Sequence, residues 1–335
     1  MCLSRLFTTG IFCVALSSLL IQPAAAQLQW PSDWQLEVGS SAHVSAYCGD
    51  IGHKGAYGVF SDTQWNLVQI GGGAAIRAAQ SGKRMGFNLD VRRIRIQGAD
   101  SMSNKVVSFT RNLHFKNEMT EIAATVDYPL FRLGGQLGNF SMRHSMRAIA
   151  GIALLHHAPR AQVDRDNLCY DKLIEMGYTT PGEWHDLRTV RTEGDAYANW
   201  VATLPLGLTY TASFDNGSGK PWHVTLSGIW RWTWTDRLDD IHNQYANPWE
   251  MTPLGLALTS QSNPNDQPPC AEAPAISTFQ YQQGLEEARQ PTRGNAATRD
   301  MYFTIGLKVA RSLFAAPAQT FHKKRFRGPR VDNKR

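Results

Sequence analysis

The sequence predicts an all-β protein: a transmembrane antiparallel up-and-down β-barrel of about eight strands, with long extracellular loops and short periplasmic turns. Three observations lead to this prediction. The chain begins with an export signal, its strand candidates carry apolar side chains on alternate positions, and short and long connections alternate between those strands. This combination is typical of bacterial outer-membrane barrels.

The N-terminal segment has the three parts of a secretory signal peptide. Arg5 is followed by an apolar stretch over residues 11–21 and then by the small residues 24–26. We expect cleavage after Ala26, so that residues 1–26 are the signal peptide and residues 27–315 form the barrel. No later segment has the roughly 20 consecutive apolar residues of a membrane helix, so a membrane location requires a closed barrel. The predicted location is the outer membrane of a Gram-negative bacterium.

The strand pattern is clearest in residues 222–235. One face of this segment is apolar and carries Trp222, Val224, Leu226, Trp230, Trp232 and Trp234. The other face is mostly polar, because successive side chains of a strand point to opposite sides. Aromatic residues at both ends of a long apolar face are typical of a strand that faces lipid between two interfacial rings.

The same alternation identifies eight strand candidates. They cover residues 34–47, 64–79, 84–97, 113–130, 143–157, 197–213, 222–236 and 299–313. Within 84–97 the apolar series shifts by one residue between Val91 and Ile94, which predicts a β-bulge. A ten-stranded arrangement, with 64–79 or the last long loop rearranged, is the alternative.

The connections between these candidates alternate in length. Those after the second, fourth and sixth are short or rich in turn residues, around 80–83, from 133–136 onward, and at 215–221. The others are longer, and two are very long, near 158–196 and 238–298. By this parity the long loops face outward and both termini lie in the periplasm.

Charged side chains fall on the predicted inner faces of the strands: Arg92, Glu121, Asp127, Arg147, Arg231 and Lys308. Because side chains fill the interior of an eight-stranded barrel, we expect an ion-paired plug. A narrow polar channel or a catalytic cluster is the alternative. Asp236, Asp239 and Asp240 are expected to form a rim of solvated or Arg-paired carboxylates, with a Ca²⁺ site as the alternative. No cofactor or metal is predicted.

The sequence does not predict an enzyme. His156 and His157 lie near several acidic residues, but neighbouring side chains at a strand end point to opposite faces, and no serine-hydrolase or zinc-protease motif occurs. A lipid-modifying barrel that uses either histidine is the alternative. A Cys169–Cys270 disulfide and unpaired thiols are both compatible with the spacing of the cysteines.

The basic pI of about 9.1 is a property of the C-terminal tail, residues 316–335. Residues 321–335 hold seven Lys or Arg against one Asp, whereas the rest of the mature chain is nearly neutral. Export excludes nucleic acid as the partner of this tail. Lys323, Lys324, Arg325 and Arg327 are instead candidates to bind an acidic partner surface or anionic lipid, and a solvated, disordered end is the alternative.

Several short motifs follow one another along the chain: residues 111–115 with Glu118 and Glu121, residues 191–194, residues 204–207 and residues 230–241. In order and spacing they resemble the PorG-like outer-membrane barrel proteins of the type IX secretion system. The matching residues that the resemblance places at strand ends and in the lumen are Arg111, Asn112, Phe115, Glu121, Thr192, Glu193, Gly194, Arg231, Asp236, Asp239 and Asp240.

The resemblance covers roughly residues 34–313. It implies a non-enzymatic barrel that anchors or docks a periplasmic ring built of a lipoprotein and a ring-forming partner. The chain departs from the family in the Pro/Gln-rich insertion before its last strand and in its basic tail. A small outer-membrane pore or a stand-alone structural envelope barrel is the alternative function.

Overall fold

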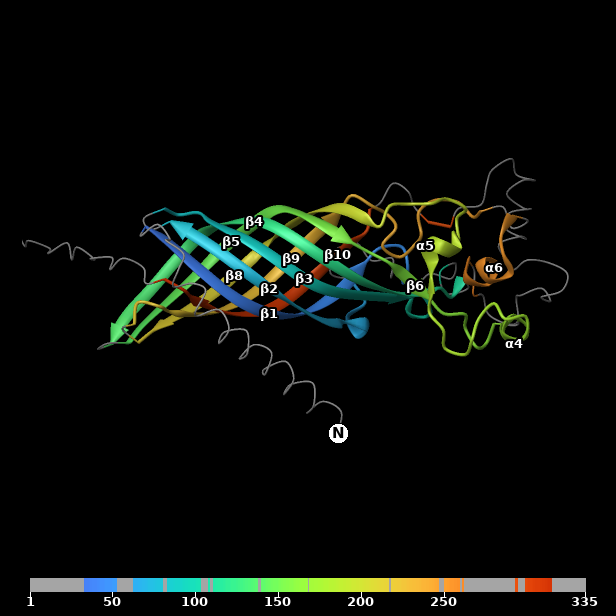
Figure 1. The fold of residues 1–335 in the computed structure, drawn as a ribbon, viewed down its shortest axis with the longest axis horizontal. Helices are drawn as coiled ribbons and strands as arrows, with labels where there is room; N and C mark the ends of the chain where they lie inside the picture. The colour runs from blue at the N-terminus through green and yellow to red at the C-terminus, as the bar shows by residue number, and fades with distance from the viewer. Residues whose placement is uncertain are drawn as a thin grey trace, which may run out of the picture.

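The computed structural model describes residues 33–52, 63–80, 83–103, 108, 111–137, 140–167, 169–216, 218–246, 250–259, 261, 293–294 and 299–314. Within these ranges, eight long strands form a closed antiparallel barrel in which each strand pairs with its neighbours in the sequence (Figure 1). They are β1 (Trp34–Cys48), β2 (Gln69–Gln80), β3 (Gly86–Ala99), β4 (His114–Leu137), β5 (Phe140–His156), β8 (Trp200–Asp215), β9 (Trp222–Thr233) and β10 (Met301–Ser312). The predicted antiparallel barrel of eight strands is confirmed.

The first and last strands close the barrel by pairing along their length, from Glu37 opposite Ser312 to Cys48 opposite Met301. The register also has a regular stagger. We start at Gly86 on β3 and move from each residue to its partner on the next strand, once around the barrel. With the β2–β3 register continued by three residues, this path returns to β3 at Ile96. The offset from residue 86 to residue 96 means that the strands are tilted relative to the barrel axis. The interior of an eight-stranded barrel is just wide enough for side chains to fill it.

The alternating faces agree with the prediction. On β9 the outward Leu226 is 52% exposed, whereas the inward Thr225 is 6% exposed. The outer face of the barrel is a belt of exposed apolar side chains, which includes Phe87, Leu89, Val91, Ile152, Leu154, Leu204, Leu206, Leu208, Trp232, Ile305 and Leu307. The described part of the chain contains no helix long and apolar enough to cross a bilayer.

The predicted bulge in β3 is wrong. This strand pairs with β4 without a register shift, from Gly86 opposite Asp127 to Ala99 opposite His114. Ile94 and Ile96 point into the barrel and are buried, whereas Val91 points outward. Apolar residues therefore occupy the outer face up to Val91 and the inner face from Ile94, because the interior of the barrel is apolar around Ile94 and Ile96. The shift in the apolar pattern does not require the extra residue of a bulge.

The predicted end of the fourth strand is also wrong. Residues 133–136, read from the sequence as a turn, belong to β4, which continues to Leu137. A register shift between Pro129 and Phe131 marks a bulge against β5. The pairing of β4 with β3 ends at Asp127, so Pro129 lies where β4 has become an edge, a position that tolerates proline. The β4–β5 hairpin extends beyond the other strands at this end of the barrel (Figure 1).

The two ends of the barrel differ as expected. We call the end that carries the β2–β3, β4–β5 and β8–β9 connections the short-turn end, and the opposite end the long-loop end. Over the long-loop end fold β6 (Pro159–Ala161), β7 (His185–Asp186), α4 (Tyr170–Glu175), α5 (Leu187–Val190) and α6 (Pro253–Thr259) (Figure 1). These elements share a small apolar core of their own, made of Ala161, Val163, Leu173, Leu187, Ala257 and Leu258.

Candidate functional site

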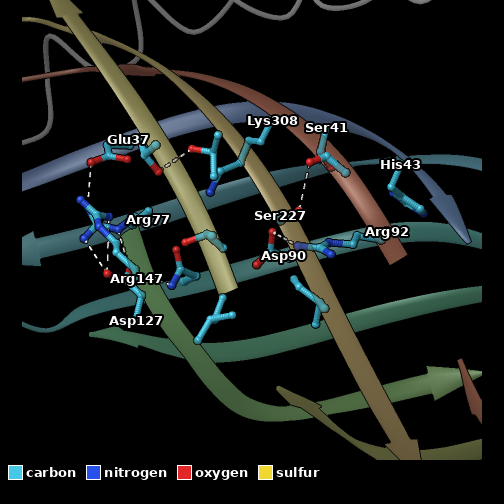
Figure 2. Close-up of a pocket in the computed structure, with 17 residues that line it drawn as sticks. Glu37, Ser41, His43, Arg77, Asp90, Arg92, Asp127, Arg147, Ser227 and Lys308 are labelled. Atoms are coloured by element: carbon cyan, nitrogen blue, oxygen red, sulfur yellow. Dashed lines mark hydrogen bonds and ion pairs between the residues drawn. The ribbon is translucent and has the colours of Figure 1, made fainter. Parts of the chain in front are cut away.

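The lumen of the barrel is filled in layers, and the layer nearest the short-turn end is a network of ion pairs (Figure 2). Arg77 donates to Glu37 at 2.7 Å and to both carboxylate oxygens of Asp127 at 2.7 and 3.0 Å. Arg147 lies 3.4 Å from Asp127 on the other side. These side chains come from β1, β2, β4 and β5, so their contacts join strands from different sides of the barrel.

Above this network lies a small polar cavity, lined in part by Lys308, Asp90, Arg92, Ser41 and His43 (Figure 2). Its volume is about 40 Å³, which is room for about three water molecules. Arg92 donates to Asp90 at 3.0 Å, while the hydroxyl of Ser41 and both ring nitrogens of His43 have no partner among the described residues. Buried polar atoms around such a cavity are the setting in which proteins hold ordered water.

A buried ion pair crosses the middle of the lumen. Arg231 of β9 donates from Nε and Nη2 to the two carboxylate oxygens of Glu121 on β4, at 2.6 and 3.0 Å. The hydroxyl of Tyr302 donates to the same carboxylate at 2.8 Å, and Arg231 also donates to Thr304 at 2.7 Å. Because all three nitrogens of the guanidinium donate and both carboxylate oxygens accept, the cost of burying the two charges is largely offset.

Next toward the long-loop end is an apolar layer, in which Leu238 and Ile241 enter the barrel from the loop after β9. Its other members are Tyr47, Ile51, Ile94, Ile96, Leu113, Phe115, Met119, Leu155 and Tyr302. The rings of Tyr47 and Phe115 meet edge to face at 4.8 Å. Asn117 fixes the entering loop, because its side-chain amide donates to the carbonyl of Leu238 at 2.7 Å.

A group of buried carboxyls covers this apolar layer. The hydroxyl of Tyr47 lies 2.5 Å from Asp239 and 2.9 Å from Asp300. Burial raises the pKa of Asp239 to about 7, and burial together with Asp239 raises the pKa of Asp300 well above its usual range. A single hydroxyl proton cannot serve two carboxylates, so the arrangement is most favourable when one carboxyl is protonated and donates to the tyrosine oxygen.

Two arginines tie the loops to the mouth of the barrel. Arg111 donates to both oxygens of Asp100, at 2.7 and 3.0 Å, and to the backbone carbonyl of Arg293 at 2.7 Å. Arg293 in turn donates to Glu193 at 3.2 Å and to the carbonyl of Asp240 at 2.7 Å. These contacts link segments that are far apart in the sequence into one buried cap.

Asp240 lies at the centre of the cap. Its carboxylate accepts hydrogen bonds from Thr192 and, at 2.6 Å, from Tyr197. Burial raises its pKa to about 6, and the neighbouring guanidinium of Arg293 opposes that rise. Burial next to Asp239 raises the pKa of Asp236 to about 8, and Asp236 also lies 3.1 Å from the ring nitrogen of His242.

The structure brings the family-motif residues together at the mouth and in the lumen. Arg111, Phe115, Glu121, Glu193, Arg231, Asp236, Asp239 and Asp240 have the contacts given above. Asn112 has a left-handed backbone, with a φ of 51°, and donates to the carbonyl of Gln261 at 3.2 Å. Gly194 has a φ of 82°, which favours glycine, and its N–H donates to the carbonyl of Arg191 at 2.8 Å. Their common location is therefore a plug that holds loops in the mouth of the barrel.

The three aspartates after β9 are held by protein side chains rather than arranged as an oxygen cage. Over the described ranges, no group of three or more His, Cys, Asp or Glu side chains is arranged to hold a metal ion. The adjacent histidines point apart: His156 contacts Asn199 at 3.0 Å and the Trp200 ring, whereas His157 is buried against Tyr197.

Several plug residues were missed from the sequence. Glu37, Arg77, Asp90 and Tyr302 lie at inward positions of predicted strands, so the alternation could have identified them. Asp300 also lies at an inward position, because it has the parity of Tyr302 in the predicted strand 299–313. Asp100 and Arg293 belong to long loops, where no periodic pattern places a residue relative to the barrel. Only the folded loops bring these charges to Arg111 and Asp240.

Other predicted residues fall outside the described residues. These are the signal peptide, the tail residues Lys323, Lys324, Arg325 and Arg327, and Cys270. Cys169 is disulfide-bonded. Its pairing with Cys270 stays a prediction.

Comparison with known proteins does not assign the chain to a family. No protein-family model and no curated protein matches the sequence.

Proposed function

We propose that this protein is a closed outer-membrane barrel that acts without enzymatic activity as the anchor or dock of a periplasmic ring complex in a type IX-like secretion machine. The partners would be the ring lipoprotein and its ring-forming partner, as the resemblance to PorG-like proteins implies. The observation that carries the proposal is the filled lumen, because a barrel that is blocked along its axis acts through its surfaces.

The outer belt supports a location in a membrane. On β9, Trp222 and Trp232 are both exposed on the apolar outer face. With a rise of about 3.3 Å per residue and a strand tilt of about 40°, the stretch between them is about 25 Å high. This is the height of the apolar band in outer-membrane barrels. The surrounding apolar side chains have no other cover among the described residues.

The lumen supports an anchor over a pore. The Arg231–Glu121 pair crosses the interior, and the apolar layer with its cap of carboxyls closes the long-loop end. The remaining cavity holds only a few water molecules. A solute path would require several buried ion pairs to separate, each of which costs several kcal/mol.

The test is affinity purification of the tagged, full-length protein from detergent-solubilised outer membranes, followed by quantitative mass spectrometry. The proposal predicts recovery of a periplasmic lipoprotein and its ring-forming partner in a fixed ratio to the barrel. A chain that lacks residues 321–335 should recover less of both if the basic tail contributes, and unchanged recovery would remove the tail from the contact. Recovery of the barrel alone contradicts the docking function and favours a stand-alone envelope protein.

A further inference from the structure

The described structure leaves one strand edge of the barrel open. The pairing of β3 with β4 ends at Gly86 opposite Asp127, but β4 continues to Leu137. No described residue pairs with the β3 side of this extension. On its other side the extension is paired with β5 except at the bulge between Pro129 and Phe131, and β5 is paired with β8 in turn. The open edge is therefore backed by a sheet of three strands, and we call it the β4 edge, residues 128–137.

The β4 edge extends past the apolar belt. Tyr128 is exposed on the outer face near the short-turn end. Beyond it, Leu130, Phe131 and Leu133 are 55%, 44% and 65% exposed. If the barrel spans the outer membrane, Leu133 and the rest of the edge face the periplasm. Figure 1 shows this hairpin reaching beyond the remaining strands.

An open edge of this length is unusual in a folded protein. Pro129, which has no N–H, and the bulge before Phe131 interrupt its first part. Beyond them the edge presents a row of unpaired N–H and C=O groups, which natural proteins usually cover or interrupt to prevent unwanted pairing. Leu133 adds an apolar side chain that water surrounds. The combination of an unpaired strand edge and exposed apolar groups is the surface on which an extended segment of a partner adds as a further strand.

The charge around the β4 edge selects among possible occupants. Exposed basic side chains surround it, namely Lys83 and Arg84 before β3, Arg132 on β4 and Arg143 on β5. Asp127, the nearest acidic residue on the strand, is buried and ion-paired with Arg77. A second copy of the chain would bring the same positive charge, and so would the basic tail. Like charges oppose both arrangements, whereas an acidic segment is attracted.

We propose that the β4 edge is a strand-addition site for an extended segment of a periplasmic protein that carries acidic residues beside apolar ones. Backbone hydrogen bonds from the edge would hold the segment, Leu133 would contact its apolar residues, and Arg132 and Arg143 would set its preference for acidic residues. This inference rests on the docking function proposed above and assigns it to one surface of the barrel.

The first test is amide hydrogen exchange on the complex that co-purifies with the full-length protein, compared with the barrel alone. Strand addition protects alternate amides of residues 132–137, beyond Pro129 and the bulge, because only every second N–H of this regular stretch faces the open edge. Amides of β8 and β9 at the same end, which are already paired, serve as the internal control and should not change. An unchanged exchange pattern along the β4 edge in an intact complex overturns the inference.

The second test reverses charge without altering the strands. In the variant Arg132→Glu/Arg143→Glu we expect recovery of the complex to fall about tenfold, because opposite charges on the rim govern association. The matched controls are Arg132→Lys/Arg143→Lys and Lys220→Glu, a reversal in the β8–β9 turn away from the edge, and both should stay within about twofold of the parent. Heat-modifiable mobility in electrophoresis verifies that each variant is folded.

The outcomes separate the two proposals. If the parent protein carries no periplasmic complex, the docking function and the strand-addition site both fail. If the complex is recovered but charge reversal at the edge has no more effect than Lys220→Glu, the docking function stands and this site is wrong. In a Leu133→Cys variant, disulfide crosslinks between two copies through position 133 would identify the edge as a self-association surface and would also overturn the inference.

Discussion

Arg231 and Glu121 form a two-point ion pair across the lumen, with the guanidinium on β9 and the carboxylate on β4. The two strands are not neighbours in the sheet, so the pair joins separate parts of the barrel wall. Tyr302 and Thr304 of β10 complete its hydrogen bonds. The pair therefore fixes the width of the barrel at the level where the polar lumen meets the apolar layer.

A double-mutant cycle tests the energetic role of this pair. We expect Glu121→Gln or Arg231→Met alone to lower the free energy of unfolding by about 3–5 kcal/mol, because each leaves a buried charge without its partner. The double variant should lose less than the sum of the two single changes. Urea unfolding in lipid vesicles, followed by tryptophan fluorescence, gives these values. Additive losses would show that the two side chains do not interact in the folded barrel.

The buried carboxyls at the mouth predict a pH dependence of stability. The pKa of Asp236 is raised to about 8 and that of Asp239 to about 7, so the folded state binds more protons than the unfolded chain above pH 4. Stability from these groups is present at low pH and is lost as the pH rises through 7 and 8, by at most about 1.4 kcal/mol per pH unit for each proton. Asp236→Asn should flatten this loss.

The measurement is the free energy of unfolding between pH 6 and pH 9, where carboxylates that pair with arginine are ionised in both states. A matched control is Asp195→Asn, which changes an exposed carboxylate and should leave the slope unaltered. If the free energy of unfolding rose with pH across this range, Asp236 and Asp239 would not be protonated in the folded protein, and the prediction would be wrong.

The disulfide of Cys169, together with the predicted pairing, implies a covalent link from this residue to Cys270. Peptide mapping under non-reducing conditions should recover a peptide from 169 joined to one from 270, and either Cys169→Ser or Cys270→Ser should abolish it. Since a closed loop of about 100 residues restricts the unfolded chain, reduction should destabilise the folded loops by up to about 5 kcal/mol. Recovery of a link from Cys169 to another cysteine would refute the predicted pairing.

The sequence is sufficient to predict the barrel because outward and inward positions alternate along its strands. Leu226 and Thr225 show how strongly that alternation separates exposed from buried side chains. It fails where the interior itself becomes apolar, as at Ile94 and Ile96, since the same pattern then looks like a bulge. It also fails at residues 133–136, because two glycines in an extended edge strand resemble a turn.

The plug is harder to predict than the wall. Inward charges such as Glu121 and Arg231 are evident from strand parity, but parity does not say which pairs will meet across the lumen. Arg293 reaches the mouth only because its loop folds over it, and that folding depends on tertiary contacts such as the one between Asn117 and Leu238. The motif residues indicated where the plug lies, but not which side chains in it contact one another.

The claim that this protein acts as a closed barrel is tested most directly by its conductance in planar lipid bilayers. Folded, heat-modifiable protein should insert without producing stable current steps, because the Arg231–Glu121 pair and the apolar layer block the lumen. The double variant Glu121→Ala/Arg231→Ala serves as the comparison, since it removes the charged pair but leaves the outer belt intact. Stable, regular current steps from the parent protein would contradict the account and would indicate a solute pore.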